Sequence, residues 1–130
     1  MRYLIDTQVF IWALVSPENL SATVRHIAQN NTLCVSAVSL LEITIKQKIG
    51  KLPELPVTTD ALVQQAERDG FELLPLSVQH IAHYAAIPLF ADHRDPFDLL
   101  ILATALAEGM PLISADEKFS RYRDIVDVIW

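Results

Sequence analysis

The sequence predicts an α/β fold, a three-layer α/β/α sandwich around a mostly parallel central sheet. Three observations favour this fold. Short apolar runs without polar alternation are typical of parallel strands that are covered on both faces. These runs alternate with helical segments of about ten residues, and no hairpin dipeptide joins any two of them. The 130 residues match the usual length of one domain with a full core, so we expect a single domain over residues 1–130.

Each element is predicted from its apolar pattern and from the residues that end it. Ser36 and Ser77 are suitable N-caps, the Ser16-Pro17 pair ends the first helix, and Gly109 is placed to end the last one. The predicted strands are 3–5, 33–35, 71–74, 112–114 and 125–129, and the predicted helices are 9–15, 20–29, 36–48, 59–69, 78–86 and 95–108.

Composition and charge narrow the possible functions. The chain is 52% hydrophobic with a mean hydropathy of +0.30, which indicates apolar surface that meets a partner, and we expect a homodimer or a complex. Its net charge of −6 excludes a nucleic-acid binder that relies on a basic face, so a polyanionic substrate would need help from cations.

The sequence also predicts where the protein works. The single cysteine, Cys34, lies in an apolar run and has no partner for an internal disulfide, which fits a reducing compartment. Asp6 comes too early for the apolar region of a signal peptide. The longest apolar run, 99–107, is far shorter than the ~20 residues that span a bilayer. We therefore expect a soluble cytoplasmic protein with no membrane contact.

Acidic residues follow the predicted strands at the positions where open parallel sheets form their sites. Asp6 ends the first strand, Asp116 follows the fourth, and Asp95 and Asp98 flank the start of the helix that leads into the fourth strand. A structural explanation is open for each of them. Asp6, Asp95 and Asp116 could be N-caps, with Pro96 at the first helical position, and Asp98 could complete a capping box.

Glu42 falls inside the apolar face of its predicted helix. A buried carboxylate needs a partner, and Lys46, four residues later, is the structural candidate. The face predicted to pack on the core consists of Val38, Leu41, Ile45 and Ile49.

Taken together, these acids predict a cation site. Four or five carboxylates at one place would repel one another and raise their own pKa values, and a divalent cation would remove that repulsion. Oxygen ligands without a cluster of histidine or cysteine favour Mg²⁺ or Mn²⁺ over zinc.

Other kinds of site fit less well. His80 and His83 lack a third ligand in register and are interpreted as surface or packing residues. Thr7 and Ser114 have no histidine beside them in a hydrolase motif, which excludes a Ser-His-Asp triad. A receiver-like phosphoacceptor would need two adjacent acids after the first strand and a lysine after the last, and the chain has neither.

In four segments the chain resembles PIN-domain ribonucleases, in particular the VapC-type toxins of bacterial toxin–antitoxin systems. The segments are LIDTQVFIW at 4–12, SAVSLLEITIKQKIGKL at 36–52, HRDPFDLLILATALAEG at 93–109 and LISADEKF at 112–119. They occur in the family's order at similar separations and cover most of the chain.

The resemblance implies a PIN-like sandwich and metal-dependent hydrolysis of RNA phosphodiester bonds, with a 5′-phosphate and a 3′-hydroxyl as products. It also implies a cognate antitoxin and a homodimer. By resemblance, the catalytic and metal-binding set is Asp6, Glu42, Asp98 and Asp116, with Asp95, Thr7 and Ser114 as accessory residues. Lys46 and Arg94 lie near the predicted rim of the site and are candidates for contacts to the RNA backbone.

The chain departs from the family pattern at two positions. Relatives with a DPFD segment often continue with arginine where this chain has Leu99, and they often have histidine where it has Gln8. The alternative function is a PIN-like module that binds RNA or protein and has lost catalysis.

Overall fold

The computed structural model describes all residues, 1–130, and is built around one sheet of five parallel strands. The strands are β1 (Arg2–Ile5), β2 (Thr32–Ser36), β3 (Glu72–Leu74), β4 (Leu112–Ile113) and β5 (Val128–Ile129). Their order across the sheet is β3-β2-β1-β4-β5. Every pairing is parallel, which confirms the predicted sheet.

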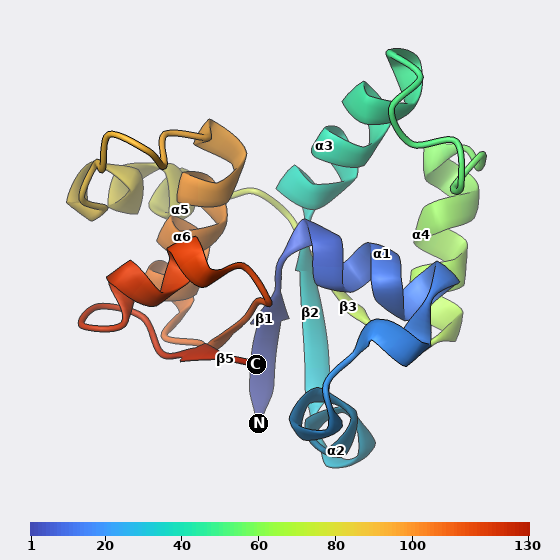
Figure 1. Ribbon diagram of the computed structural model, residues 1–130, viewed down its shortest axis with the longest axis horizontal. Coiled ribbons are helices and arrows are strands. Elements are labelled where there is room, and N and C mark those ends of the chain that lie inside the picture. Colours follow the sequence, from blue (N-terminus) through green and yellow to red (C-terminus); the bar gives the residue numbers. More distant parts are fainter.

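Helices cover both faces of this sheet and make the three layers (Figure 1). They are α1 (Thr7–Val15), α2 (Ala22–Asn30), α3 (Ala37–Lys48), α4 (Thr59–Arg68), α5 (Val78–His83) and α6 (Pro96–Glu108), with short 3₁₀ helices η1 (Pro17–Asn19), η2 (Tyr84–Ala86) and η3 (Glu117–Tyr122). No helix has the length and apolar character needed to cross a membrane.

Two buried clusters hold the layers together, one on each face of the sheet. On one face, α6 contributes Ile101 and Leu102, and η3 adds the fully buried Phe119 and Tyr122. On the other face, side chains of α1, α2 and α4 form the second cluster around Phe10. Since both faces of the central strands are covered, their residues are apolar in continuous runs rather than in alternation.

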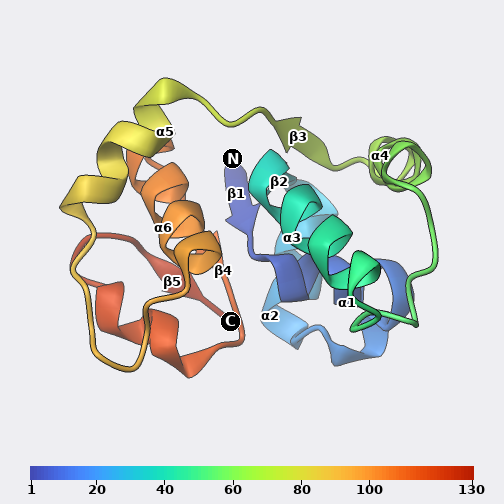
Figure 2. The same ribbon diagram turned by 90° about the horizontal axis from the view of Figure 1, so that it is seen from above.

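The strand order places a switch point beside β1. The chain leaves β1 toward β2 on one side, and only later adds β4 on the other side. Loops therefore diverge in opposite directions at the carboxyl ends of β1 and β4, and a crevice opens there, as is usual in open parallel sheets. Figure 2 shows α3 and α6 on either side of β1, and side chains from both helices line the cavity found here.

One prediction about packing is wrong. Leu41, Ile45 and Ile49 do not face the core: their side chains are 54%, 40% and 59% exposed. Val38 and Glu42 are buried as predicted, and the buried face of α3 also includes Ser39 and Ile43. α3 projects beyond the end of the sheet (Figure 1), so the sheet does not cover the three exposed side chains.

Several element ends also differ from the prediction. The helix expected over 78–86 changes to a 3₁₀ turn at Tyr84, and the strand expected over 125–129 is limited to its last two residues by pairing. Val126 is buried all the same, because the turn before β5 packs it into the core.

Candidate functional site

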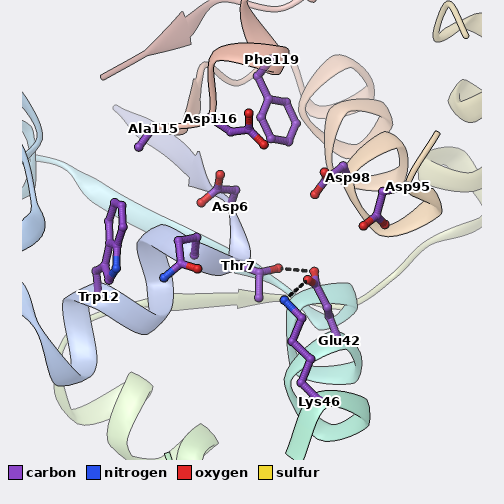
Figure 3. Close-up of a pocket in the computed structure, with 11 residues that line it drawn as sticks. Asp6, Thr7, Trp12, Glu42, Lys46, Asp95, Asp98, Ala115, Asp116 and Phe119 are labelled. Atoms are coloured by element: carbon purple, nitrogen blue, oxygen red, sulfur yellow. Dashed lines mark hydrogen bonds and ion pairs between the residues drawn. The ribbon is translucent and has the colours of Figure 1, made fainter. Parts of the chain in front are cut away.

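Five carboxylates line one cavity of about 340 Å³ at the switch point. Figure 3 shows Asp6, Asp98 and Asp116 directed toward a common space, with Glu42 and Lys46 on the α3 side. The lining residues are Asp6, Thr7, Gln8, Trp12, Glu42, Lys46, Asp95, Asp98, Ala115, Asp116 and Phe119. With all groups ionised, five carboxylates and one ammonium give the cavity four surplus negative charges.

Asp6 lies at the bottom of the cavity, directly after β1, and is 5% exposed. One of its oxygens caps α1 by accepting from the Val9 amide at 2.8 Å, and the other accepts from the Ser114 hydroxyl at 2.5 Å. Burial raises the pKa of Asp6 from 3.8 to about 6, against the lowering effect of these two hydrogen bonds. The nearby charges of Asp98 and Asp116 raise it further.

Ser114 links the ends of β1 and β4. Its oxygen donates to Asp6 and also accepts from the backbone amide of Asp116 at 3.1 Å. Asp116 in turn caps η3 by accepting from the Lys118 amide at 3.0 Å. Ser114 itself does not line the cavity, so it acts on the acids that do.

Glu42 is held from two sides. Its Oε1 is 2.9 Å from the Thr7 hydroxyl, which also hydrogen-bonds to Ser39 at 2.9 Å, and its Oε2 is 3.0 Å from Lys46 Nζ. The structural partner expected for Glu42 is therefore present. It does not remove Glu42 from the cavity, because both residues of the pair line it (Figure 3).

Asp95 and Asp98 have different local roles. Asp95 caps α6 by accepting from the Phe97 amide at 2.9 Å. The capping box expected for Asp98 does not form, since Asp98 Oδ2 lies 3.0 Å from His93 Nε2 instead. Burial raises the pKa of Asp98, the His93 contact opposes this, and the charge of Asp95 adds to the increase.

The sequence analysis missed His93, and it also missed Trp12 and Phe119, which line the cavity. His93 is 3% exposed, and its second nitrogen lies 2.9 Å from the Tyr122 hydroxyl. Its ring also meets the rings of Phe119 and Tyr122 edge-on, at 5.4 and 5.6 Å. His93 therefore fixes the orientation of Asp98 and ties α6 to η3, which begins at Asp116. No spacing signal marks it, because its partners lie 5 and 29 residues away.

Other residues singled out in the sequence lie elsewhere. Arg94 is exposed and does not line the cavity, and Leu99 is buried in the core beneath it. His80 is buried and caps the start of α5 together with Ser77, which fits its interpretation as a packing residue. Cys34 is buried, as expected.

The donor set suits a hard divalent cation in its chemistry. All the acidic donors are carboxylate oxygens, and their mutual repulsion is the kind that such an ion removes. As they stand, no three acidic, histidine or cysteine side chains are close enough to form a metal site. The ligands would therefore have to move closer together around an ion.

The fold matches known proteins. The PIN domain family model matches residues 3–125. Among curated protein sequences, none matches the chain.

Similar solved structures extend over the full length of the chain. They include VapBC2 from Rickettsia felis bound to promoter DNA, which has 18% identity and a TM-score of 0.67 and covers 100% of this chain and 99% of that one. A toxin–antitoxin complex from Klebsiella pneumoniae has 19% identity and a TM-score of 0.65, covering 98% and 96%. FitAcB from Neisseria gonorrhoeae has 21% identity and a TM-score of 0.64, covering 100% and 97%. The family match over most of the chain, on an all-parallel five-stranded sheet, shows that this protein belongs to the PIN-domain family.

Proposed function

We propose that this protein is a metal-dependent endoribonuclease and the toxin of a toxin–antitoxin system, acting as a single domain over residues 1–130. The observation that carries the proposal is the cavity at the switch point, with five carboxylates and one ammonium. Without cations such a cavity repels a phosphodiester, and with divalent cations it accepts one. Family membership favours nuclease chemistry at this place.

Asp6, Glu42, Asp98 and Asp116 would hold Mg²⁺ or Mn²⁺, with Asp95 as an accessory group. When bound, the ion would activate water and neutralise charge on the phosphate. Water would attack phosphorus in line with the departing 3′-oxygen, which takes up a proton, so the products are a 5′-phosphate and a 3′-hydroxyl.

The remaining residues of the site would orient these acids and the substrate. Thr7 and Lys46 hold Glu42, Ser114 holds Asp6, and each of these contacts limits rotation of a carboxylate. Lys46 is also the one cation of the cavity lining and would contact phosphate oxygens. Arg94, exposed beside Asp95, would contact the RNA backbone outside the cavity.

The proposed partners are an antitoxin and a second copy of the chain in the cytoplasm. The similar structures include a toxin–antitoxin complex from Klebsiella pneumoniae and a member of the VapBC family of toxin–antitoxin systems from Mycobacterium tuberculosis. Two groups of exposed apolar side chains offer contact surfaces, and such surface is more typical of interfaces than of monomers. They are Leu41, Ile45 and Ile49 on α3, and Leu76, Val78, Ile81 and Leu89 around α5. Light scattering on the purified chain tests the dimer.

Cleavage of a structured RNA in Mg²⁺ and in EDTA tests the nuclease. We expect cleavage only with the metal, and a large loss of rate in Asp98→Asn and Glu42→Gln. Asp124→Asn and Glu54→Gln are matched controls, because both residues are exposed and lie outside the cavity. Cleavage that survives both EDTA and Asp98→Asn would point to a contaminant. RNA binding without cleavage by the wild type would favour the alternative, a PIN-like binding module.

A further inference from the structure

One wall of the cavity carries no charge. The lining residues contributed by α1 are Thr7, Gln8 and Trp12, whereas the other walls hold all the acids and the lysine (Figure 3). Gln8 and Trp12 are four residues apart and so lie on one face of the helix, one turn apart. The Thr7 hydroxyl is engaged by Glu42 and Ser39, but Gln8 is exposed and Trp12 is only half-buried. A carboxamide and an indole are therefore available beside the acids.

Trp12 is supported by a second indole. The ring of Trp130, directly after β5, lies with its centroid 5.8 Å from that of Trp12 at an interplanar angle of 51°. Trp130 does not line the cavity, so this contact limits the rotation of Trp12 without occupying the space that Trp12 faces. Trp130 could be present simply because it packs the C-terminal strand against the rest of the protein. That explanation does not account for a tryptophan at position 12, beside the acidic cavity.

We propose that Gln8 and Trp12 form a nucleobase subsite, in which the indole stacks on one unpaired base of RNA and the carboxamide hydrogen-bonds to the edge of that base. This rests on the proposed function. A base is planar and uncharged, so within this cavity its most favourable surface is the α1 wall. Proteins that bind single-stranded nucleic acid stack bases on aromatic side chains, and a carboxamide offers a donor and an acceptor side by side to a base edge.

The subsite also accounts for the placement of base and phosphate. Trp12 and Asp6 line the same cavity, so a base on Trp12 belongs to a nucleotide next to the phosphate at the acids. The base then sets which phosphodiester bond reaches the carboxylates.

Tryptophan fluorescence tests the proposal directly, because the chain has only two tryptophans and both are in this pair. The experiment titrates a short single-stranded RNA into the Glu42→Gln protein in Mg²⁺, where cleavage is impaired. We expect quenching that persists in Trp130→Phe and is lost in Trp12→Phe. Trp12→Ala should weaken RNA binding by about 5-fold to 150-fold, the range for loss of one stacked base.

Abasic RNA separates a base contact from a general loss of structure. A set of RNAs is used in which each nucleotide in turn lacks its base. With the base missing at one particular position, Trp12→Ala should no longer weaken RNA binding. Gln8→Ala should change the preference for the base at that same position, whereas the exposed Gln64→Ala should not. If Trp12→Ala is poorly folded, Trp12→Leu, which keeps an apolar side chain without an aromatic ring, and Gln8→Ala provide the comparison, with Mn²⁺ affinity as the check on the acids.

The outcomes distinguish this inference from the proposed function. RNA binding by the parent protein with no quenching, and with equal affinity in the Trp12 and Gln8 variants, would overturn the subsite alone. The absence of both RNA cleavage by the wild type and RNA binding would overturn the proposed function and the subsite with it.

Discussion

Replacing Asp6 with asparagine should stabilise the metal-free protein. Asp6 is buried and its pKa is raised from 3.8 to about 6, chiefly by burial. In the unfolded chain this carboxyl ionises near its ordinary pKa, so between those two values the unfolded state binds fewer protons. Stability is therefore lost as pH rises through this window. The full cost of ionising Asp6 in the folded protein is about 3 kcal/mol at pH 7.5.

Asparagine keeps the shape of Asp6 and removes its charge. The amide oxygen can still accept from the Val9 amide, and the Ser114 hydroxyl can turn to accept from the new amide group. Asp6→Asn should exceed the wild type in free energy of unfolding by about 1 kcal/mol at pH 4.5 and about 3 kcal/mol at pH 7.5. Distant groups titrate alike in both proteins, so their contributions cancel when one free energy of unfolding is subtracted from the other.

Urea denaturation in EDTA measures this difference across the pH range. An Asp6→Asn protein that is no more stable than the wild type at pH 7.5, or whose advantage shrinks as pH rises, would refute the reasoning. Adding Mg²⁺ gives a second measurement. It should stabilise the wild type by relieving the repulsion among the acids, and it should have much less effect on Asp6→Asn.

Three further variants test how the site is held. Lys46→Met removes the cation beside Glu42, so the Mn²⁺ affinity measured by calorimetry should rise by about five-fold, and a fall would contradict this. Ser114→Ala removes a donor to Asp6 and so raises its pKa in the folded protein. The pH window of the stability difference described above should therefore extend to higher pH, and an unchanged upper end would count against that hydrogen bond. His93→Phe keeps the ring packing but removes the hydrogen bonds, so Mn²⁺ affinity should fall by about 10-fold to 100-fold, and unchanged affinity would leave His93 a packing residue only.

The sheet could be predicted from the sequence because its signals are local. Each strand is a short apolar run beside a cap or glycine, and helices between the runs leave parallel pairing as the simple solution. The face of α3 that packs could not be predicted in the same way. The spacing of Leu41, Ile45 and Ile49 is that of a buried face, yet burial depends on where the helix lies, and α3 extends past the sheet. Ser39 and Glu42 occupy the buried face instead.

That the acids lie close together could also be predicted from the sequence, but for a different reason. Strand ends of a parallel sheet share one edge, so Asp6 and Asp116 are brought together by topology alone. The contacts that hold the acids depend on tertiary packing. His93 reaches Asp98 only because the segment before α6 folds back against η3, and nothing in the order of residues 87–95 encodes that path.

For three of the acids, capping and chemistry are not competing explanations. Asp6, Asp95 and Asp116 each cap a helix with one oxygen, and in Asp95 and Asp116 the second oxygen accepts no hydrogen bond from the protein. A cap holds the carboxylate at a helix start. Helices α1 and η3 start just after β1 and β4 end, and the start of α6 lines the same cavity. At Asp116 the role of the negative charge and the role of the helix cap can be tested separately, because asparagine caps a helix as well as aspartate does. Asp116→Asn should keep wild-type stability and lose Mn²⁺ affinity, whereas Asp116→Ala should lose both, with about 1 kcal/mol of stability. Equal Mn²⁺ affinity in Asp116→Asn and the wild type would show that the carboxylate is there for the helix alone.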